Sequence, residues 1–262
     1  MNLNRNFQVI KESIIIGFKQ AFEYRANLYS SLIAAITDTF ISIFVFLVFV
    51  ELTDSFSMSI YEIIFFILLK QVGLDLFWSL QKGRYKVFNM ITKGNFNLLL
   101  TRPVNIFILY TFRDFKARWL IISILYFIVL FSFIVSVGEN IFKFFFVTFI
   151  SVLVFGYLLI SIIYCAESLG FFKMNVKGNQ IGGLNLTLAG FPPTMFEQFT
   201  YRFFLFLFPL VLFGVSTFYY FGRISLEFFL LSILISIILS LVLNIITYII
   251  WEIGLKKYEA FG

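Results

Sequence analysis

Three charged side chains, Asp38, Lys70 and Asp75, lie within long apolar stretches of this sequence. If such stretches cross a bilayer, each buried charge costs about 2.5–3.5 kcal/mol, so these residues should pair or serve an ion or proton pathway. Asp38 and Lys70 each lie about ten residues along their stretch, which at ~1.5 Å per residue places them at similar depth. We therefore hypothesise an Asp38–Lys70 ion pair. The alternatives are that Lys70 extends its amine toward the membrane surface or that the boundaries of the spans are shifted.

Catalytic chemistry has little support in the sequence. The chain has no His and one Cys, Cys165, which excludes His-based acid–base catalysis, His or Cys metal clusters and a disulfide within the chain. Cys165 lies in an apolar run and is expected to be a small packing residue. The glycines of "GNQIGG" lack the lysine of a phosphate-binding loop. We expect no cofactor and no enzymatic activity in this chain, so any work must be driven by a partner or an ion gradient.

Composition identifies the class of protein. Hydrophobic residues make up 61% of the 262 residues, charged residues make up 13%, and the mean hydropathy is +0.97. A soluble domain contains about 25% charged residues. The recurring apolar stretches predict an all-α polytopic membrane protein. Six stretches supply roughly the 20 apolar residues that one span needs. They are Leu28–Val50, Ile60–Leu80, Trp119–Val137, Ile141–Cys165, Tyr201–Tyr220 and Glu227–Trp251.

The distribution of basic residues predicts the orientation. Of 20 Lys and Arg residues, 17 fall in the N-terminal segment, the 81–118 loop, the 166–202 region and the C-terminal tail. Only Lys143 and Arg223 fall on the opposite side. Because basic residues concentrate in cytoplasmic loops, both termini are predicted to be cytoplasmic. The basic charge is thereby explained by the bilayer, and no nucleic-acid partner is expected.

We divide the chain into a cytoplasmic amphipathic segment, 1–27, and a transmembrane domain, 28–262. In the first segment one helical face is apolar and the other is polar, so this segment is predicted to lie along the inner membrane surface or to pack on the protein. The apolar face consists of Phe7, Ile10, Ile14, Phe18, Ala21 and Phe22. The cytoplasmic region 166–200 is rich in glycine and contains Pro192-Pro193, which indicates an interfacial helix that breaks before the prolines.

The basic loop 81–118 contains the stretch "LLLTRPVN", which is too short to span a membrane. Leu98, Leu99 and Leu100 can form the apolar face of a short helix that ends before Pro103, because a residue before proline resists the α conformation. Arg102 would then be exposed at the end of this helix. Such a projection suits docking to a soluble partner, and it equally suits a helix lying on lipid headgroups.

Four motifs in order resemble the membrane subunits of an ABC type 2 exporter family. "GNFNLLLTRPVN", which starts at Gly94, resembles the loop signature of that family. "FPPTMF", with Pro192, looks like its aromatic–proline segment, and "LFP", with Pro209, resembles its fifth span. The tail "WEIGLKKYEAFG" is similar to the terminal pattern of the family. Its matching positions are Trp251, Gly254, Tyr258 and Gly262. Pro193 and Phe261 depart from the family pattern.

The resemblance implies a multi-pass permease of the prokaryotic cell membrane without ATPase activity of its own. Two permease chains, identical or paralogous, would form the pathway, and a separate ABC ATPase would bind ATP and Mg²⁺ below them. Leu98–Leu100, Arg102 and Pro103 would form the ATPase-coupling loop. Pro209 would kink the fifth span, and Trp251 and Tyr258 would be interfacial anchors.

Two other functions remain open at this point. A gradient-driven carrier or channel would transport without an ATPase and would depend on Asp38. A membrane scaffold would not transport under any condition. No convincing repeat relates residues 28–137 to 141–251, whereas many carriers are built from inverted repeats.

Overall fold

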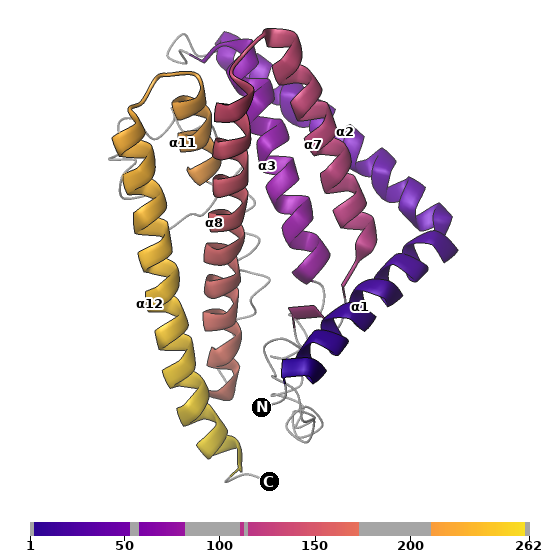
Figure 1. Cartoon of the computed structure of the whole chain (residues 1–262), viewed down its shortest axis with the longest axis vertical. Coiled ribbons are helices and arrows are strands. Elements are labelled where there is room, and N and C mark those ends of the chain that lie inside the picture. Colours follow the sequence, from indigo (N-terminus) through magenta and orange to yellow (C-terminus); the bar gives the residue numbers. More distant parts are fainter. Residues whose placement is uncertain (1–2, 53–57, 82–110, 113–114, 173–210, 260–262) are drawn as a thin grey trace.

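A computed structural model describes residues 3–52, 58–81, 111–112, 115–172 and 211–259 of the chain. The described chain consists of helices and short connections (Figure 1). In chain order these are α1 (Leu3–Glu23), α2 (Arg25–Leu52), α3 (Ile60–Gln81), α7 (Ala117–Val137), α8 (Ile141–Ser168), the 3-10 helix η1 (Leu169–Phe172), α11 (Val211–Tyr220) and α12 (Leu226–Glu259).

Five described helices, α2, α3, α7, α8 and α12, are long and apolar enough to cross a membrane. This confirms the all-α membrane class. Each overlaps one predicted span, and α11 covers the second half of the predicted span Tyr201–Tyr220. Helix α8 continues to Ser168 and is followed by η1, so helical structure extends beyond Cys165, where we predicted the span to end, into the cytoplasmic region 166–200, for which we predicted an interfacial helix. Residues 173–200 lie outside the described part of the chain.

Helix α3 forms the centre of the bundle and packs against α2, α7, α8 and α11. Its sequence is apolar on all sides, which is the pattern of a helix buried within a larger bundle. Phe65 of α3 stacks on Tyr220 of α11 with ring centroids 4.7 Å apart. Most of α2, in contrast, is exposed in the isolated chain. The polar residues described below therefore lie between a fixed central helix and a peripheral one.

Residues 138–140, which separate the two predicted spans ending at Val137 and beginning at Ile141, form the turn that joins α7 to α8. Gly138 adopts a left-handed conformation with φ of 77°, and its N–H donates to the carbonyls of Ile134 and Val135. This geometry satisfies carbonyls at the end of α7, and glycine adopts it without the steric penalty of a side chain. The Asn140 side chain then accepts a hydrogen bond from the Lys143 N–H and starts α8.

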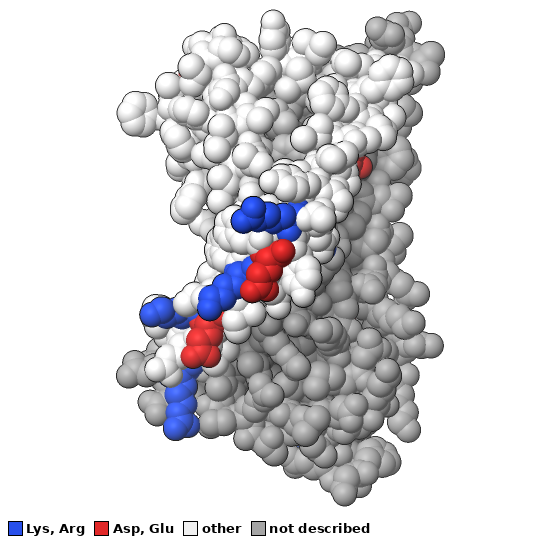
Figure 2. Space-filling model, turned by 90° about the vertical axis from the view of Figure 1, so that its right-hand side faces the viewer, with Lys and Arg blue, Asp and Glu red and all other residues white. Residues whose placement is uncertain are grey.

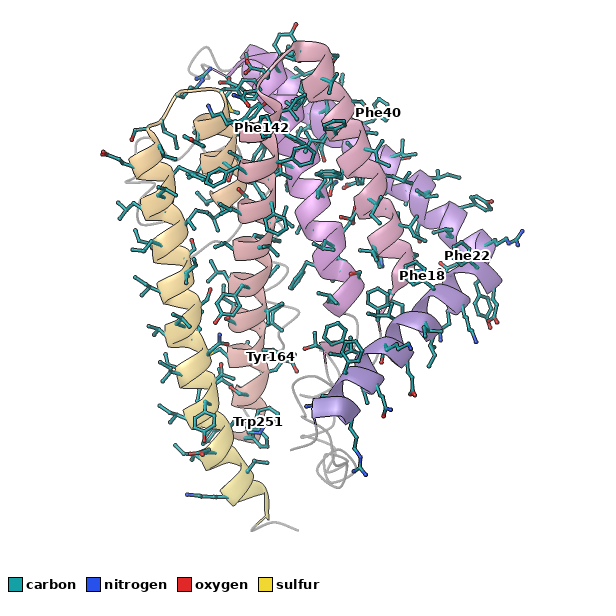
Figure 3. The ribbon with its side chains drawn as sticks, viewed as in Figure 1. Phe18, Phe22, Phe40, Phe142, Tyr164 and Trp251 are labelled. Atoms are coloured by element: carbon teal, nitrogen blue, oxygen red, sulfur yellow. The ribbon has the colours of Figure 1, made fainter. Side chains whose placement is uncertain are left out.

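Helix α1 lies across the end of the bundle where α12 also ends (Figure 1). Ala21 is buried, and Ile14 and Phe18 pack beside it against Phe115 and the start of α7. Phe22, predicted on the same face, is exposed (Figure 3). Charged side chains form one stripe along α1, and the surface over α2 is almost entirely uncharged (Figure 2). This sharp change from charged to apolar surface is typical of a helix at a membrane boundary.

Candidate functional site

Asp38 of α2 and individual polar residues of α3 meet inside the apolar part of the bundle. The Asp38 carboxylate accepts a hydrogen bond from the Gln71 side-chain amide at 3.0 Å. The hypothesised Asp38–Lys70 ion pair is not formed in the described structure, although buried Lys70 lies near enough to be attracted electrostatically. Successive residues of a helix point about 100° apart, so Gln71 faces Asp38 where we had placed Lys70.

Asp75 lies one turn beyond Gln71 on the same helix. Its side chain is only 5% exposed, and one carboxylate oxygen, Oδ2, is buried without a hydrogen-bond partner. Buried polar atoms are nearly always satisfied in native proteins, and ionisable groups at this depth usually mark functional positions. Asp75 is therefore the strongest candidate among the three intramembrane charges for contact with a ligand or ion.

Helix α7 forms the third side of the polar site around Asp38 and Asp75, and it is hydrogen-bonded to both α2 and α3. The Tyr126 hydroxyl donates to the Ala35 carbonyl of α2 at 2.6 Å and lies 2.6 Å from the Thr39 hydroxyl. The Ser123 hydroxyl donates to the Val72 carbonyl of α3 at 2.8 Å. These bonds connect α7 to both neighbouring helices in an environment where water does not compete for them. We missed Tyr126 and Ser123 in the sequence because isolated hydroxyls in an apolar span carry no distinctive pattern.

A cavity of about 430 Å³ lies between α2, α3 and α7. Asp38, Gln71 and Asp75 provide its polar groups, and Trp78, Trp119 and Tyr126 provide aromatic walls. Carboxylates beside aromatic faces suit binding of a positively charged or hydrogen-bonding group. Among the described residues, no group of three or more His, Cys, Asp or Glu side chains is placed to hold a metal ion.

At the end of the bundle away from α1, an ion pair that we did not predict connects two parts of the chain. Glu62 of α3 pairs with Arg223, which lies between α11 and α12, through two hydrogen bonds. Glu62 also accepts from the Ser59 N–H at 2.6 Å, while Ser59 Oγ accepts from the Glu62 N–H at 3.4 Å. This reciprocal arrangement is a capping box. The S-x-x-E pattern at Ser59–Glu62 was a visible signal of it.

Lys143, the second basic residue at this end, is also bound within the protein. Its amine donates to the Tyr220 carbonyl at 2.8 Å and lies 4.7 Å from the ring centre of Tyr219. A cation at the C-terminal end of α11 is favoured by the helix dipole and satisfies a carbonyl without an intrahelical partner. Arg223 and Lys143 therefore have structural partners that connect α3, α8 and α11.

Replacing Glu62 with Gln should lower the melting temperature of the purified protein. The substitution removes the charge that Arg223 requires, and a charge-assisted buried contact contributes about 1–3 kcal/mol. Thermal unfolding in detergent would measure this loss. Glu139→Gln provides the matched control, because Glu139 is an exposed carboxylate at the same end of the bundle. An equal effect of the two substitutions would show that the ion pair contributes nothing.

The described end of the loop 81–118 contacts three helices. The Lys116 N–H donates to the Ser79 carbonyl of α3 at 2.9 Å, and the Thr111 hydroxyl is hydrogen-bonded to the Tyr164 hydroxyl of α8. Phe115 packs on α1, where a Cβ added at Gly17 would lie 2.6 Å from its ring. Gly94, Leu98–Leu100, Arg102 and Pro103 lie outside the described residues, as do Pro192, Pro209 and Gly262.

Two tail positions form a packing site for η1. A Cβ added at Gly254 would lie 2.4 Å from Phe171, so glycine permits the close approach of η1 to α12. The Trp251 ring meets Phe171 edge-on with centroids 5.1 Å apart, and Trp251 lies on the part of α12 far from α11 (Figure 3). Tyr258 lies in α12, but its side chain is outside the described structure. The W-x-x-G spacing thus has a packing role here, and the role of Trp251 as an interfacial anchor stays a prediction.

The helices and the intramembrane polar site define a multi-pass α-helical membrane protein with a ligand-sized cavity. Residues 33–262 match the family model described as ABC-2 family transporter protein. Because the match covers most of the chain, the protein belongs to the ABC-2 transporter family. It is a membrane component of a transporter, and the resemblance inferred from the sequence is confirmed at this level. No curated protein and no solved structure matches the chain.

Proposed function

We propose that this chain is the permease subunit of an ATP-driven exporter and that a separate ABC ATPase drives it. The observation that carries the proposal is the family match over residues 33–262, in a chain whose sequence contains no nucleotide-binding motif. Two permease copies, or this chain and a paralogue, form the pathway across the membrane. ATP and Mg²⁺ bind to the ATPase subunits.

The proposed topology has six spans with both termini in the cytoplasm. The basic-residue distribution supports this orientation, and α1 and the end of α12 lie at the same end of the bundle, as an even number of spans requires (Figure 1). The predicted span Tyr201–Tyr220 completes the six crossings of this topology, and α11, its described part, is with 10 residues too short to cross a bilayer alone. The charged stripe of α1 then faces the cytoplasmic headgroup region of a prokaryotic cell membrane.

The coupling step is proposed to pass through the loop 81–118. Docking of the ATPase at Leu98–Leu100 and Arg102 moves this loop. The contacts of Thr111 with α8, Phe115 with α1 and Lys116 with α3 carry the movement into the bundle. Small displacements are transmitted well by close-packed contacts such as that of Phe115 on Gly17. A movement of the loop is thereby transmitted to α3 and α8, because the described end of the loop is hydrogen-bonded to both helices.

A gradient-driven carrier is the second candidate function, because the unpartnered Asp75 oxygen and the Asp38 carboxylate share one intramembrane cavity. Carboxylates at this depth are common in proton and ion pathways. This function predicts transport by the isolated chain that stops when the ion gradient is collapsed and that is impaired by Asp38→Asn.

Single-cysteine labelling tests the proposed orientation. After Cys165→Ser, a cysteine at Glu139 should react with a membrane-impermeant thiol reagent applied to intact cells. A cysteine at Arg102 should react only after the membrane is opened, because the positive-inside rule places its loop in the cytoplasm. The Cys165→Ser parent provides the background signal. Reaction of the Arg102 position in intact cells would contradict the topology.

A further inference from the structure

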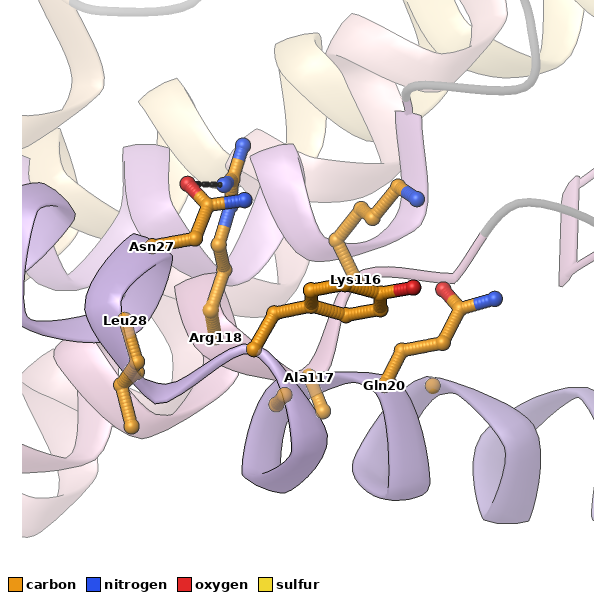
Figure 4. Close-up of a pocket in the computed structure, with 9 residues that line it drawn as sticks. Gln20, Asn27, Leu28, Lys116, Ala117 and Arg118 are labelled. Atoms are coloured by element: carbon orange, nitrogen blue, oxygen red, sulfur yellow. Dashed lines mark hydrogen bonds between the residues drawn. The ribbon is translucent and has the colours of Figure 1, made fainter.

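A polar pocket of about 380 Å³ opens where the end of α1, the start of α2 and the start of α7 meet (Figure 4). Gln20 and Tyr24 line it from the α1 side, Asn27 lines it from α2, and Lys116 and Arg118 line it from the start of α7. Among the described residues that line the pocket, none is Asp or Glu. The pocket therefore gathers two cations with amide and hydroxyl groups from three separate elements.

The hydrogen-bonding capacity of this pocket is only partly used within the chain. Arg118 donates from Nη1 to the Asn27 side-chain oxygen, but its buried Nε has no hydrogen-bond partner. Lys116 is the N-cap residue of α7, and its amine makes no hydrogen bond or ion pair within the described part of the chain, so it can donate to a ligand. The positive end of the α7 dipole adds to the two charges. Such a set of donors matches a phosphate, which presents several acceptor oxygens to Arg and Lys.

The pocket lies where two apolar segments begin. The apolar segment of α2 starts at Arg25, and that of α7 starts at Ala117, so the pocket is at the boundary between polar and apolar surface. Beyond it, the outer faces of both helices expose large aliphatic side chains such as Ile33 and Ile124. Arg118 also lies over the ring of Trp119, with 5.4 Å to the ring centroid. A ligand with a phosphate at this level and hydrocarbon chains extending along α2 and α7 fits this arrangement.

We propose that the pocket binds the phosphate headgroup of an anionic phospholipid, held mainly by Lys116 and Arg118. The lipid connects α1 to the starts of α2 and α7, and its acyl chains cover the exposed aliphatic surface between them. A free phosphate would satisfy the same donors but would leave that surface uncovered. This inference stands on the pocket geometry and does not depend on the proposed exporter function.

Native mass spectrometry of the full-length protein tests the proposal. Protein in mild detergent is titrated with phosphatidylglycerol, and the protein with one lipid retained is quantified. Lys116→Gln combined with Arg118→Gln should weaken retention about tenfold, because charge-assisted hydrogen bonds to phosphate are lost. The matched control is Lys11→Gln with Lys19→Gln, which removes the same charge from exposed positions of α1 outside the pocket. The control should change retention less than about twofold.

Two further measurements distinguish a phospholipid headgroup from free phosphate as the ligand. Phosphatidylcholine should be retained more weakly than phosphatidylglycerol, and excess inorganic phosphate should not displace the bound lipid. If the double variant does not fold, Lys116→Gln alone serves, because its side chain makes no capping bond. Unchanged retention in the pocket variants, an equal loss in the control pair, or displacement by inorganic phosphate would each overturn the proposal.

Discussion

A protein carrying Arg102→Glu should insert into the membrane normally but lose most of its ATPase partner. The substitution reverses the charge at the projecting end of the proposed coupling helix. It places a carboxylate opposite the ATPase carboxylate with which Arg102 should pair. We expect the amount of co-purified ATPase to fall by about tenfold or more, because placing like charges together across an interface costs several kcal/mol. Transport should fall with it.

Arg84→Glu is the control for this experiment, because it reverses a charge in the same loop outside the L-L-x-R-P motif. Monodisperse elution of both variants in detergent would show that insertion and folding are intact. Co-purification of the ATPase at wild-type stoichiometry by the Arg102→Glu protein, with full transport, would remove Arg102 from the coupling role.

Gly73→Leu should prevent the central bundle from assembling. A Cβ at this position of α3 would lie 2.2 Å from Cζ of Phe213, which is itself fully buried and packs against Phe155 with centroids 4.6 Å apart. Because the Phe213 ring is fully buried, we expect it to move away only if neighbouring side chains or α11 also shift. Overpacking of this kind costs about 3 kcal/mol or more when surrounding side chains cannot adjust. The folded yield in mild detergent should drop sharply.

Gly156→Leu is the matched control for Gly73→Leu. It introduces the same side chain into α8 at a position where an added Cβ meets nothing within 4 Å. Fluorescence-detected size-exclusion chromatography measures the folded fraction of both variants. A monodisperse Gly73→Leu protein with a wild-type melting temperature would mean that α3 and α11 do not pack as described.

Element positions were largely predictable because membrane spans carry a strong local signal. The start of α3 at Ile60 and the turn at Gly138 follow from a run of apolar residues bounded by capping residues and glycine. The end of α8 was less predictable. Glu167 and Ser168 look like loop residues, yet both are buried within the bundle. Tertiary burial therefore extends the helix beyond the point at which its hydropathy falls.

Side-chain partners could not be predicted, because they depend on how each helix is rotated about its axis. From the depth of each residue along its span we predicted that Asp38 faces Lys70. The rotation of α3 about its axis instead brings Gln71 to the Asp38 carboxylate. The Glu62–Arg223 pair joins residues far apart in the sequence, and no periodic pattern connects them. The tight contacts at Gly17, Gly73 and Gly254 have the same origin, since a glycine in a helix does not reveal which ring approaches it.

The composition of the native complex tests the central claim most directly. The tagged chain is purified from its own membranes in mild detergent, and the subunits and ATP hydrolysis of the complex are measured. We expect two permease chains bound to two copies of a separate protein with a phosphate-binding loop, and we expect this complex to hydrolyse ATP. A chain that purifies without any nucleotide-binding subunit, and that transports in sealed vesicles on an ion gradient alone, would contradict it.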